Sequence, residues 1–226
     1  MSEDQFSPKE YWESRLSNSF DLTGVGQKGF DDIYNLKAYK ARIRGLDQLL
    51  KESGVKPQDL RILDIGVGTG FYIDFWKKLG AAEIVGLDIS GKSVSELKAR
   101  YPQYRFIETD ISDSETLVGE RTFDIITAFD VFFHIVDEKL FQRALENLRS
   151  LAHEDSVILI LDVFSKSPVA QAAAHVRFRT YRYYQEALNA SGMEIKHVKP
   201  VFYFLAPPID IDNLDSRFQR NLVLLA

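Results

Sequence analysis

The chain of 226 residues contains no cysteine. Disulfide bonds and thiolate zinc sites are therefore excluded, and so is every mechanism that needs a cysteine nucleophile.

Long apolar runs and a basic excess are also missing. No stretch approaches the ~20 apolar residues that span a bilayer, and residues 1–5 are polar and acidic, unlike a signal peptide. The formal net charge of −5 does not suggest the basic surface typical of proteins that bind long nucleic acids. We therefore predict a cytoplasmic protein without a membrane partner, and nucleic acid is disfavoured as a partner.

Repeats, low-complexity tracts and Gly/Ser/Pro-rich linkers are absent from the sequence, so we expect one domain over residues 1–226. Residues 1–55 predict a helical cap. Ser7 is a good N-cap for a first helix, three glycines over 21–30 predict a loop, and a second helix is expected over 31–52.

Residues 60–165 alternate short apolar runs with amphipathic stretches. Strands are expected over 61–65, 84–87, 104–108, 123–129 and 156–163. Helices are expected over 71–79, 92–100 and 137–152. This alternation is typical of βαβ units, so the fold class is α/β with a mainly parallel sheet.

The last part, residues 166–226, differs in pattern. A helix over 180–190 is followed by two strand-like runs, 193–205 and 221–225, with no helix between them. Two consecutive strands of this kind predict an antiparallel hairpin at the edge of the sheet. We expect this part of the chain to lie on the substrate side.

A glycine loop follows the first expected strand and opens a helix. Its glycines, Gly66, Gly68 and Gly70, have the spacing G-x-G-x-G, and Phe71 stands where a dinucleotide fingerprint has its third glycine. Asp64 precedes the loop, and a carboxylate there repels a pyrophosphate but attracts a cation. The loop therefore favours a ligand without phosphate.

Four aspartates lie at or near the carboxyl ends of successive expected strands: Asp64, Asp88, Asp110 and Asp130. Ligands of open α/β sheets bind outside these strand ends. Asp88 comes 18 residues after Gly70, close to the spacing of about 20 expected for an acid that binds ribose hydroxyls. A ligand with a ribose, an adenine amine and a positive charge fits this row, and S-adenosylmethionine is such a ligand.

These segments resemble the motifs of class I S-adenosylmethionine-dependent methyltransferases. Residues 64–70 resemble the first motif, 86–90 the second, 109–111 the third and 128–134 the fourth. The resemblance covers residues 60–165, the expected cofactor-binding core. It implies a Rossmann-like, doubly wound sheet of seven strands with an antiparallel C-terminal strand.

The resemblance also implies the residues that bind the cofactor, S-adenosyl-L-methionine. Asp88 would contact the ribose, the third motif the adenine and the fourth motif the methyl donor. We further hypothesise that the helix after Ser7 is a lid with Tyr11 or Trp12 facing the cofactor. The candidate cofactor-binding residues are Asp64, Gly66, Val67, Gly68, Thr69, Gly70, Phe71, Asp88, Ile89, Ser90, Asp110, Ile111, Phe129 and Trp12.

His134 is the candidate general base, because it follows the fourth strand and its usual pKa falls in a useful range. The alternative is that His134 begins a helix and packs against Phe132 or Phe133. Apart from His175, the other histidines have no comparable placement. Asp130 alone does not make the Asp/Asn cluster that metal-assisted catechol methylation needs, so no metal is predicted.

The acceptor class follows partly from missing signatures. The place after the fourth strand lacks the Asn/Asp-Pro-Pro-aromatic box of amino-directed DNA methyltransferases, and cytosine C5 methylation needs a cysteine. Aromatic residues and Arg177, Arg179 and Arg182 crowd the variable ends of the chain. They favour a small organic acceptor, aromatic or carrying a carboxylate, methylated on oxygen or nitrogen in the biosynthesis of a specialised metabolite.

Three alternatives stay open at this point. They are an NAD-dependent oxidoreductase, a cofactor-binding protein without catalysis, and a methyltransferase acting on RNA or protein.

Overall fold

The structure is a computed structural model that describes residues 6–27, 29–113, 115, 122–167, 170–202 and 218–225. Its helices are α1 (Pro8–Asn18), α2 (Leu22–Val25), α3 (Asp32–Ser53), α4 (Ile73–Lys78), α5 (Gly91–Arg100), the 3₁₀ turn η1 (Phe132–His134), α6 (Glu138–Ser150) and α7 (Tyr181–Ala190). Its strands are β1 (Arg61–Ile65), β2 (Glu83–Asp88), β3 (Arg105–Glu108), β4 (Phe123–Phe129), β5 (Ala152–Ser165), β6 (Ala170–Ala173), β7 (Val176–Thr180), β8 (Ile195–Phe202) and β9 (Phe218–Leu225). Residues 203–205 of the strand-like run expected over 193–205 lie outside the described residues.

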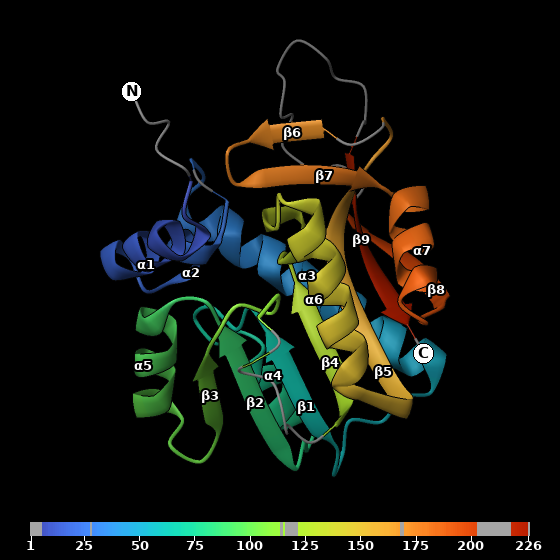
Figure 1. Cartoon of the computed structure of the whole chain (residues 1–226). Helices are drawn as coiled ribbons and strands as arrows, with labels where there is room; N and C mark the ends of the chain where they lie inside the picture. Colours follow the sequence, from blue (N-terminus) through green and yellow to red (C-terminus); the bar gives the residue numbers. More distant parts are fainter. Residues whose placement is uncertain are drawn as a thin grey trace.

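The sheet has the order β3-β2-β1-β4-β5, and all of these neighbours pair in parallel. β9 pairs antiparallel with β5 on one side and with β8 on the other. The expected mainly parallel sheet and the antiparallel C-terminal hairpin are therefore confirmed. Figure 1 shows the carboxyl ends of β1, β2 and β4 pointing to the edge where α1, α2 and the β6–β7 hairpin lie.

Two hydrophobic cores cover the two faces of the sheet. Leu63 and Ile65 of β1 pack in one core with Phe141 and Leu145 of α6. Ile62 of the same strand belongs to the other core, together with buried residues of α3, α4 and α5. This period-2 alternation within one apolar strand is what a sheet buried on both faces requires. The fold is therefore doubly wound, as expected.

Caps set the helix boundaries much as the sequence predicts. The Ser7 hydroxyl accepts a hydrogen bond from the backbone N–H of Glu10, and α3 ends at Gly54 in the left-handed conformation with φ 72°. The described part of the chain corrects two expectations. The loop over 21–30 contains the one-turn helix α2, capped by Asp21, and the sheet has nine strands rather than seven, because the β6–β7 hairpin adds two.

Candidate active site

A cavity of about 1550 Å³ lies at the carboxyl edge of the sheet. The loops after β1, β2, β3 and β4 form its floor, and α1, the start of α3 and the β6–β7 hairpin contribute the remaining walls. Ligand pockets usually measure roughly 300–1,000 Å³. This cavity therefore has room for a cofactor and a second molecule side by side.

The glycine loop is tied to the neighbouring strand. The N–H groups of Gly66 and Val67 both donate to the Leu87 carbonyl, at 2.8 and 3.0 Å. Gly66 has φ 70°, and a Cβ there would stand 2.5 Å from Cγ2 of Val131. Only glycine fits this position, because a side chain would be both strained and in collision with β4's loop. The loop thus presents bare backbone to the cavity.

Asp88 at the end of β2 faces this loop. Its Oδ2 accepts from the N–H of Gly68 at 2.8 Å, and its Oδ1 accepts from the N–H of Ser90 at 2.9 Å. The side chain lines the cavity, and burial raises the pKa of Asp88 above its ordinary value. Two backbone donors therefore fix the orientation of a carboxylate that still reaches the cavity.

Asp64 lies beneath the loop, outside the cavity lining. Its Oδ1 accepts from the Thr127 hydroxyl at 2.7 Å, while Oδ2 is buried without a hydrogen-bond partner. Burial raises the pKa of Asp64 to about 7. A buried carboxylate oxygen without a donor is costly, and a nearby cation would relieve that cost.

The other candidate cofactor residues divide into two groups. Gly70 and Ser90 do not line the cavity; Ser90 instead caps α5 through the N–H of Ser93. The remainder line it, and they are Gly66, Val67, Gly68, Thr69, Phe71, Asp88, Ile89, Asp110, Ile111, Phe129 and Trp12. Asp110 is oriented by its neighbour Ser112, whose N–H and hydroxyl both donate to Oδ1 at 2.8 Å.

A buried ion pair forms part of the cavity wall. The Arg42 guanidinium of α3 lies 2.7 Å from Oδ2 of Asp130, with the two side chains 7% and 19% exposed, and it also covers the Tyr39 ring. Asp130 adopts φ 59° directly after β4. Sequence reasoning missed Arg42, although its position in the apolar stripe of α3 with Leu46 and Leu49 was a signal for a partnered charge.

The candidate general base, His134, packs against the rings of Trp12 and His175. His134 Nδ1 donates to the His175 carbonyl at 2.8 Å, which leaves Nε2 as the unprotonated nitrogen of the neutral ring. Trp12 packs edge-on against this ring at 4.9 Å between centroids, and the His175 ring stacks at 5.6 Å. Burial lowers the pKa of His134 to about 4, below the usual value on which the sequence-based assignment of a general base rests. His134 is therefore neutral at physiological pH.

Helix α1 is fastened over this site near its start and at its middle. The Glu13 carboxylate accepts from the Ser90 hydroxyl at 2.7 Å and from the Lys92 N–H at 3.1 Å. Lys9 forms an ion pair with Glu108 at 2.6 Å. Glu13 thus places a negative charge at the N-terminus of α5, where the helix dipole favours it.

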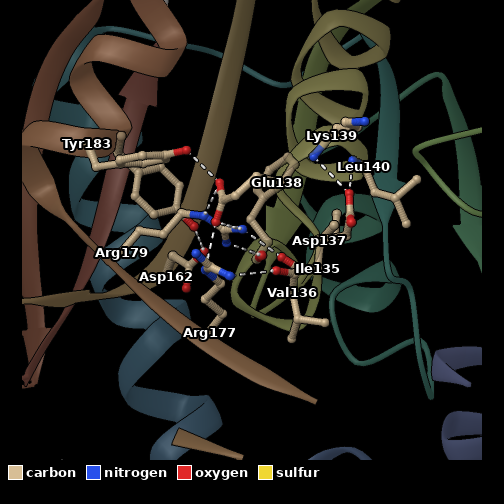
Figure 2. Close-up of polar contacts among 12 residues, drawn as sticks. Ile135, Val136, Asp137, Glu138, Lys139, Leu140, Asp162, Arg177, Arg179 and Tyr183 are labelled. Atoms are coloured by element: carbon tan, nitrogen blue, oxygen red, sulfur yellow. Dashed lines mark hydrogen bonds and ion pairs between the residues drawn. The ribbon is translucent and has the colours of Figure 1, made fainter. Parts of the chain in front are cut away.

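Glu138 at the start of α6 holds the β6–β7 hairpin (Figure 2). Its carboxylate binds Arg177 at 2.7 Å and the fully buried Arg179 at 3.1 Å, and it accepts from the Tyr183 hydroxyl at 2.5 Å. Arg179 also donates to the Ile135 carbonyl at 2.8 Å. The hairpin is the element that sequence reasoning missed, and this long-range network positions it.

The three arginines that the sequence suggests for acceptor binding all have acidic partners within the protein. Arg177 and Arg179 share the single carboxylate of Glu138, and the exposed Arg182 pairs with Glu186 at 2.8 Å. Of the three, only Arg177 lines the cavity.

Part of the chain is similar in sequence to known methyltransferases. A family model described as a methyltransferase domain matches residues 62–155. The mRNA cap guanine-N(7) methyltransferase of Cryptococcus neoformans is 32% identical over 84 residues, covering 37% of this chain and 13% of that protein. The ubiquinone biosynthesis O-methyltransferase of Rhodopseudomonas palustris is 30% identical over 79 residues, covering 34% of this chain and 31% of that protein. The match thus spans less than a third of either relative.

Solved structures with a similar fold cover nearly the whole chain. Magnesium protoporphyrin IX methyltransferase from Synechocystis, solved with bound SAM, has a TM-score of 0.68 at 16% identity and covers 99% of both chains. Residues 62–155 form a class I S-adenosylmethionine-dependent methyltransferase domain. The family expected from the glycine loop and the acidic row is confirmed, and S-adenosylmethionine is the cofactor that this domain type uses.

The described residues also bear on membrane insertion: none of their helices is both long and apolar enough to cross a bilayer.

Proposed function

We propose that this methyltransferase transfers a methyl group from S-adenosylmethionine to an oxygen or nitrogen of a small organic molecule, in the biosynthesis of a specialised metabolite. The observation that carries the proposal is the glycine loop whose Gly68 N–H is bound by the carboxylate of Asp88 inside a cavity large enough for two molecules. The ubiquinone-pathway and protoporphyrin enzymes named above, both acting in small-molecule pathways, support the acceptor class.

The residues present fit this cofactor better than a dinucleotide. A Cβ at Gly66 would stand 2.5 Å from Cγ2 of Val131, so the loop has to present bare backbone, and Oδ2 of Asp64 makes no hydrogen bond within the described part of the chain. The Asp64 carboxylate disfavours a pyrophosphate, whereas it suits a ligand with a positive charge. We assign Asp88 to the ribose hydroxyls, Asp110 and Ile111 to the adenine, and Phe129 and Trp12 to the neighbourhood of the reacting sulfur.

Methyl transfer from a sulfonium requires the protein mainly to align the acceptor with the methyl group and to remove the proton that the acceptor loses. When bound, S-adenosylmethionine supplies a methyl group on a positively charged sulfur, ready for in-line displacement. The cavity walls hold the acceptor in position. His134 takes the proton that the acceptor loses, because its Nδ1–H is committed to the His175 carbonyl and its Nε2 is free to accept. Helix α1 excludes water from the closed site.

An acceptor screen tests the proposal. Purified protein is incubated with labelled S-adenosylmethionine and, in separate reactions, with phenols, amines, carboxylic acids, total RNA and ribosomal protein. We expect label transfer only to members of the small-molecule set. Transfer only to RNA or protein would contradict the acceptor class. Tight cofactor binding with no transfer to any acceptor would favour a binding protein without catalysis.

A further inference from the structure

One cationic side chain in the cavity, that of Arg15, has no acidic partner among the described residues. Arg15 of α1 is half-buried and lines the cavity. Its Nη2 donates to the carbonyls of Thr23 and Gly26, each at 3.0 Å, and its Nη1 donates to the Tyr11 hydroxyl at 3.4 Å. In the described part of the chain, no carboxylate lies within ion-pair distance of this guanidinium.

Two other guanidinium groups of the cavity wall contact a carboxylate, although Glu138 is shared with Arg179. Arg42 pairs with Asp130 and Arg177 pairs with Glu138, each at 2.7 Å. Arg143 and Lys139 also line the cavity but are exposed at its rim. Arg15 is therefore an interior cation of the described wall that has no carboxylate within ion-pair distance, and a half-buried charge of this kind favours an anionic ligand.

The hydrogen-bond inventory of Arg15 points to the same ligand. A guanidinium has five N–H donors, and the three bonds above use neutral acceptors only. The remaining donors, one on Nε and one on Nη1, can each donate a charge-assisted hydrogen bond to an anionic oxygen such as that of a carboxylate.

The surroundings of Arg15 are aromatic and lead to the candidate base. Its guanidinium lies 5.2 Å from the Trp12 ring centroid, and Trp12 packs against His134 at 4.9 Å. An acceptor whose anion meets Arg15 can thus lay a ring beside Trp12 and present a nucleophile near His134.

We propose that Arg15 recognises a carboxylate on the methyl acceptor, so that the enzyme acts on a small aromatic acid. This rests on the proposed function. Arg15 takes the place that sequence reasoning gives to Arg177, Arg179 and Arg182, because those three have acidic partners within the fold.

Calorimetry with a matched probe pair tests the proposal. The probes are 4-hydroxybenzoate and its neutral analogue 4-hydroxybenzamide, titrated into the protein with and without saturating S-adenosylhomocysteine. We expect the wild type to bind the acid at least about tenfold more tightly than the amide, as charge-assisted hydrogen bonds imply. Arg15→Met should abolish the preference and Arg15→Lys should retain part of it. Arg182→Met, which removes an exposed paired arginine of α7, should leave it unchanged.

Each contrary result has a distinct meaning. Equal affinity for the two probes, no binding of either, or a preference that survives Arg15→Met would overturn the proposal. So would a loss of more than about tenfold in S-adenosylhomocysteine affinity in Arg15→Met, since Arg15 would then serve the cofactor. Absence of S-adenosylhomocysteine binding to the wild type would instead contradict the proposed function, and the acid preference would still be measurable on the free protein.

Discussion

Replacing Asp130 by asparagine isolates the charge of the buried ion pair. Asparagine has the same shape and tolerates the positive φ of 59° at this position, so the variant adds little backbone strain. The Arg42 guanidinium, 7% exposed, would lose the carboxylate that lies 2.7 Å away. Breaking a buried pair costs about 3–5 kcal/mol. Because Asp130 itself is 19% exposed, we expect a loss near the lower end, about 3 kcal/mol.

Urea unfolding followed by circular dichroism measures this loss. In a chain of this length, 1 kcal/mol shifts the melting temperature by roughly 2–4 °C, so about 3 kcal/mol corresponds to roughly 6–12 °C. Asp47→Asn is the control, because it removes an exposed ion pair with Lys51 on the same helix and should cost less than about 0.5 kcal/mol. A loss in Asp130→Asn no larger than that of the control would refute the reasoning.

Three further variants test separate parts of the site. Glu13→Gln weakens the hydrogen bonds to Ser90 and Lys92 that fasten α1. We expect proteases to cut α1 faster in the variant than in the wild type, and S-adenosylhomocysteine to slow cleavage of the wild type. Cleavage that changes with neither the substitution nor the ligand would contradict the hypothesis that α1 is a lid. Burial raises the pKa of Asp64 to about 7 in the folded protein, so the native state binds the extra proton and wild-type stability falls as pH rises from about 4 to about 7. Asp64→Asn removes the contribution of Asp64 to this dependence, whereas Asp162, whose pKa burial also raises to about 7, keeps its own. Unfolding free energies of variant and wild type that run parallel across that window would contradict the prediction. His134→Ala should lower kcat by more than ~10²-fold with cofactor affinity intact, and a loss of less than about tenfold would assign His134 to packing.

The sequence predicts the part of the fold that rests on local patterns. Apolar runs and caps locate β1, α3 and α5 to within a residue or two, because strand burial and capping are decided by neighbours along the chain. The glycine loop and Asp88 are likewise predicted to lie together, and the hydrogen bond from Gly68 to Asp88 bears this out.

What the sequence does not predict depends on contacts between distant residues. The β6–β7 hairpin is held by Arg177 and Arg179 reaching Glu138, which is 39 and 41 positions away in the chain. Arg42 and Asp130 meet only because α3 packs over the end of β4. Whether an arginine is neutralised or left for a ligand is decided by such pairings, and composition alone does not reveal them.

Binding of S-adenosylhomocysteine tests the account most directly. Calorimetry on the wild type, on Asp88→Ala and with NAD as competitor ligand addresses the cofactor site at the ends of β1, β2 and β3. The account predicts micromolar binding of S-adenosylhomocysteine, a loss of at least about tenfold in Asp88→Ala, and no binding of NAD. A folded wild-type protein that binds NAD, or that binds S-adenosylhomocysteine no better than Asp88→Ala does, would contradict it.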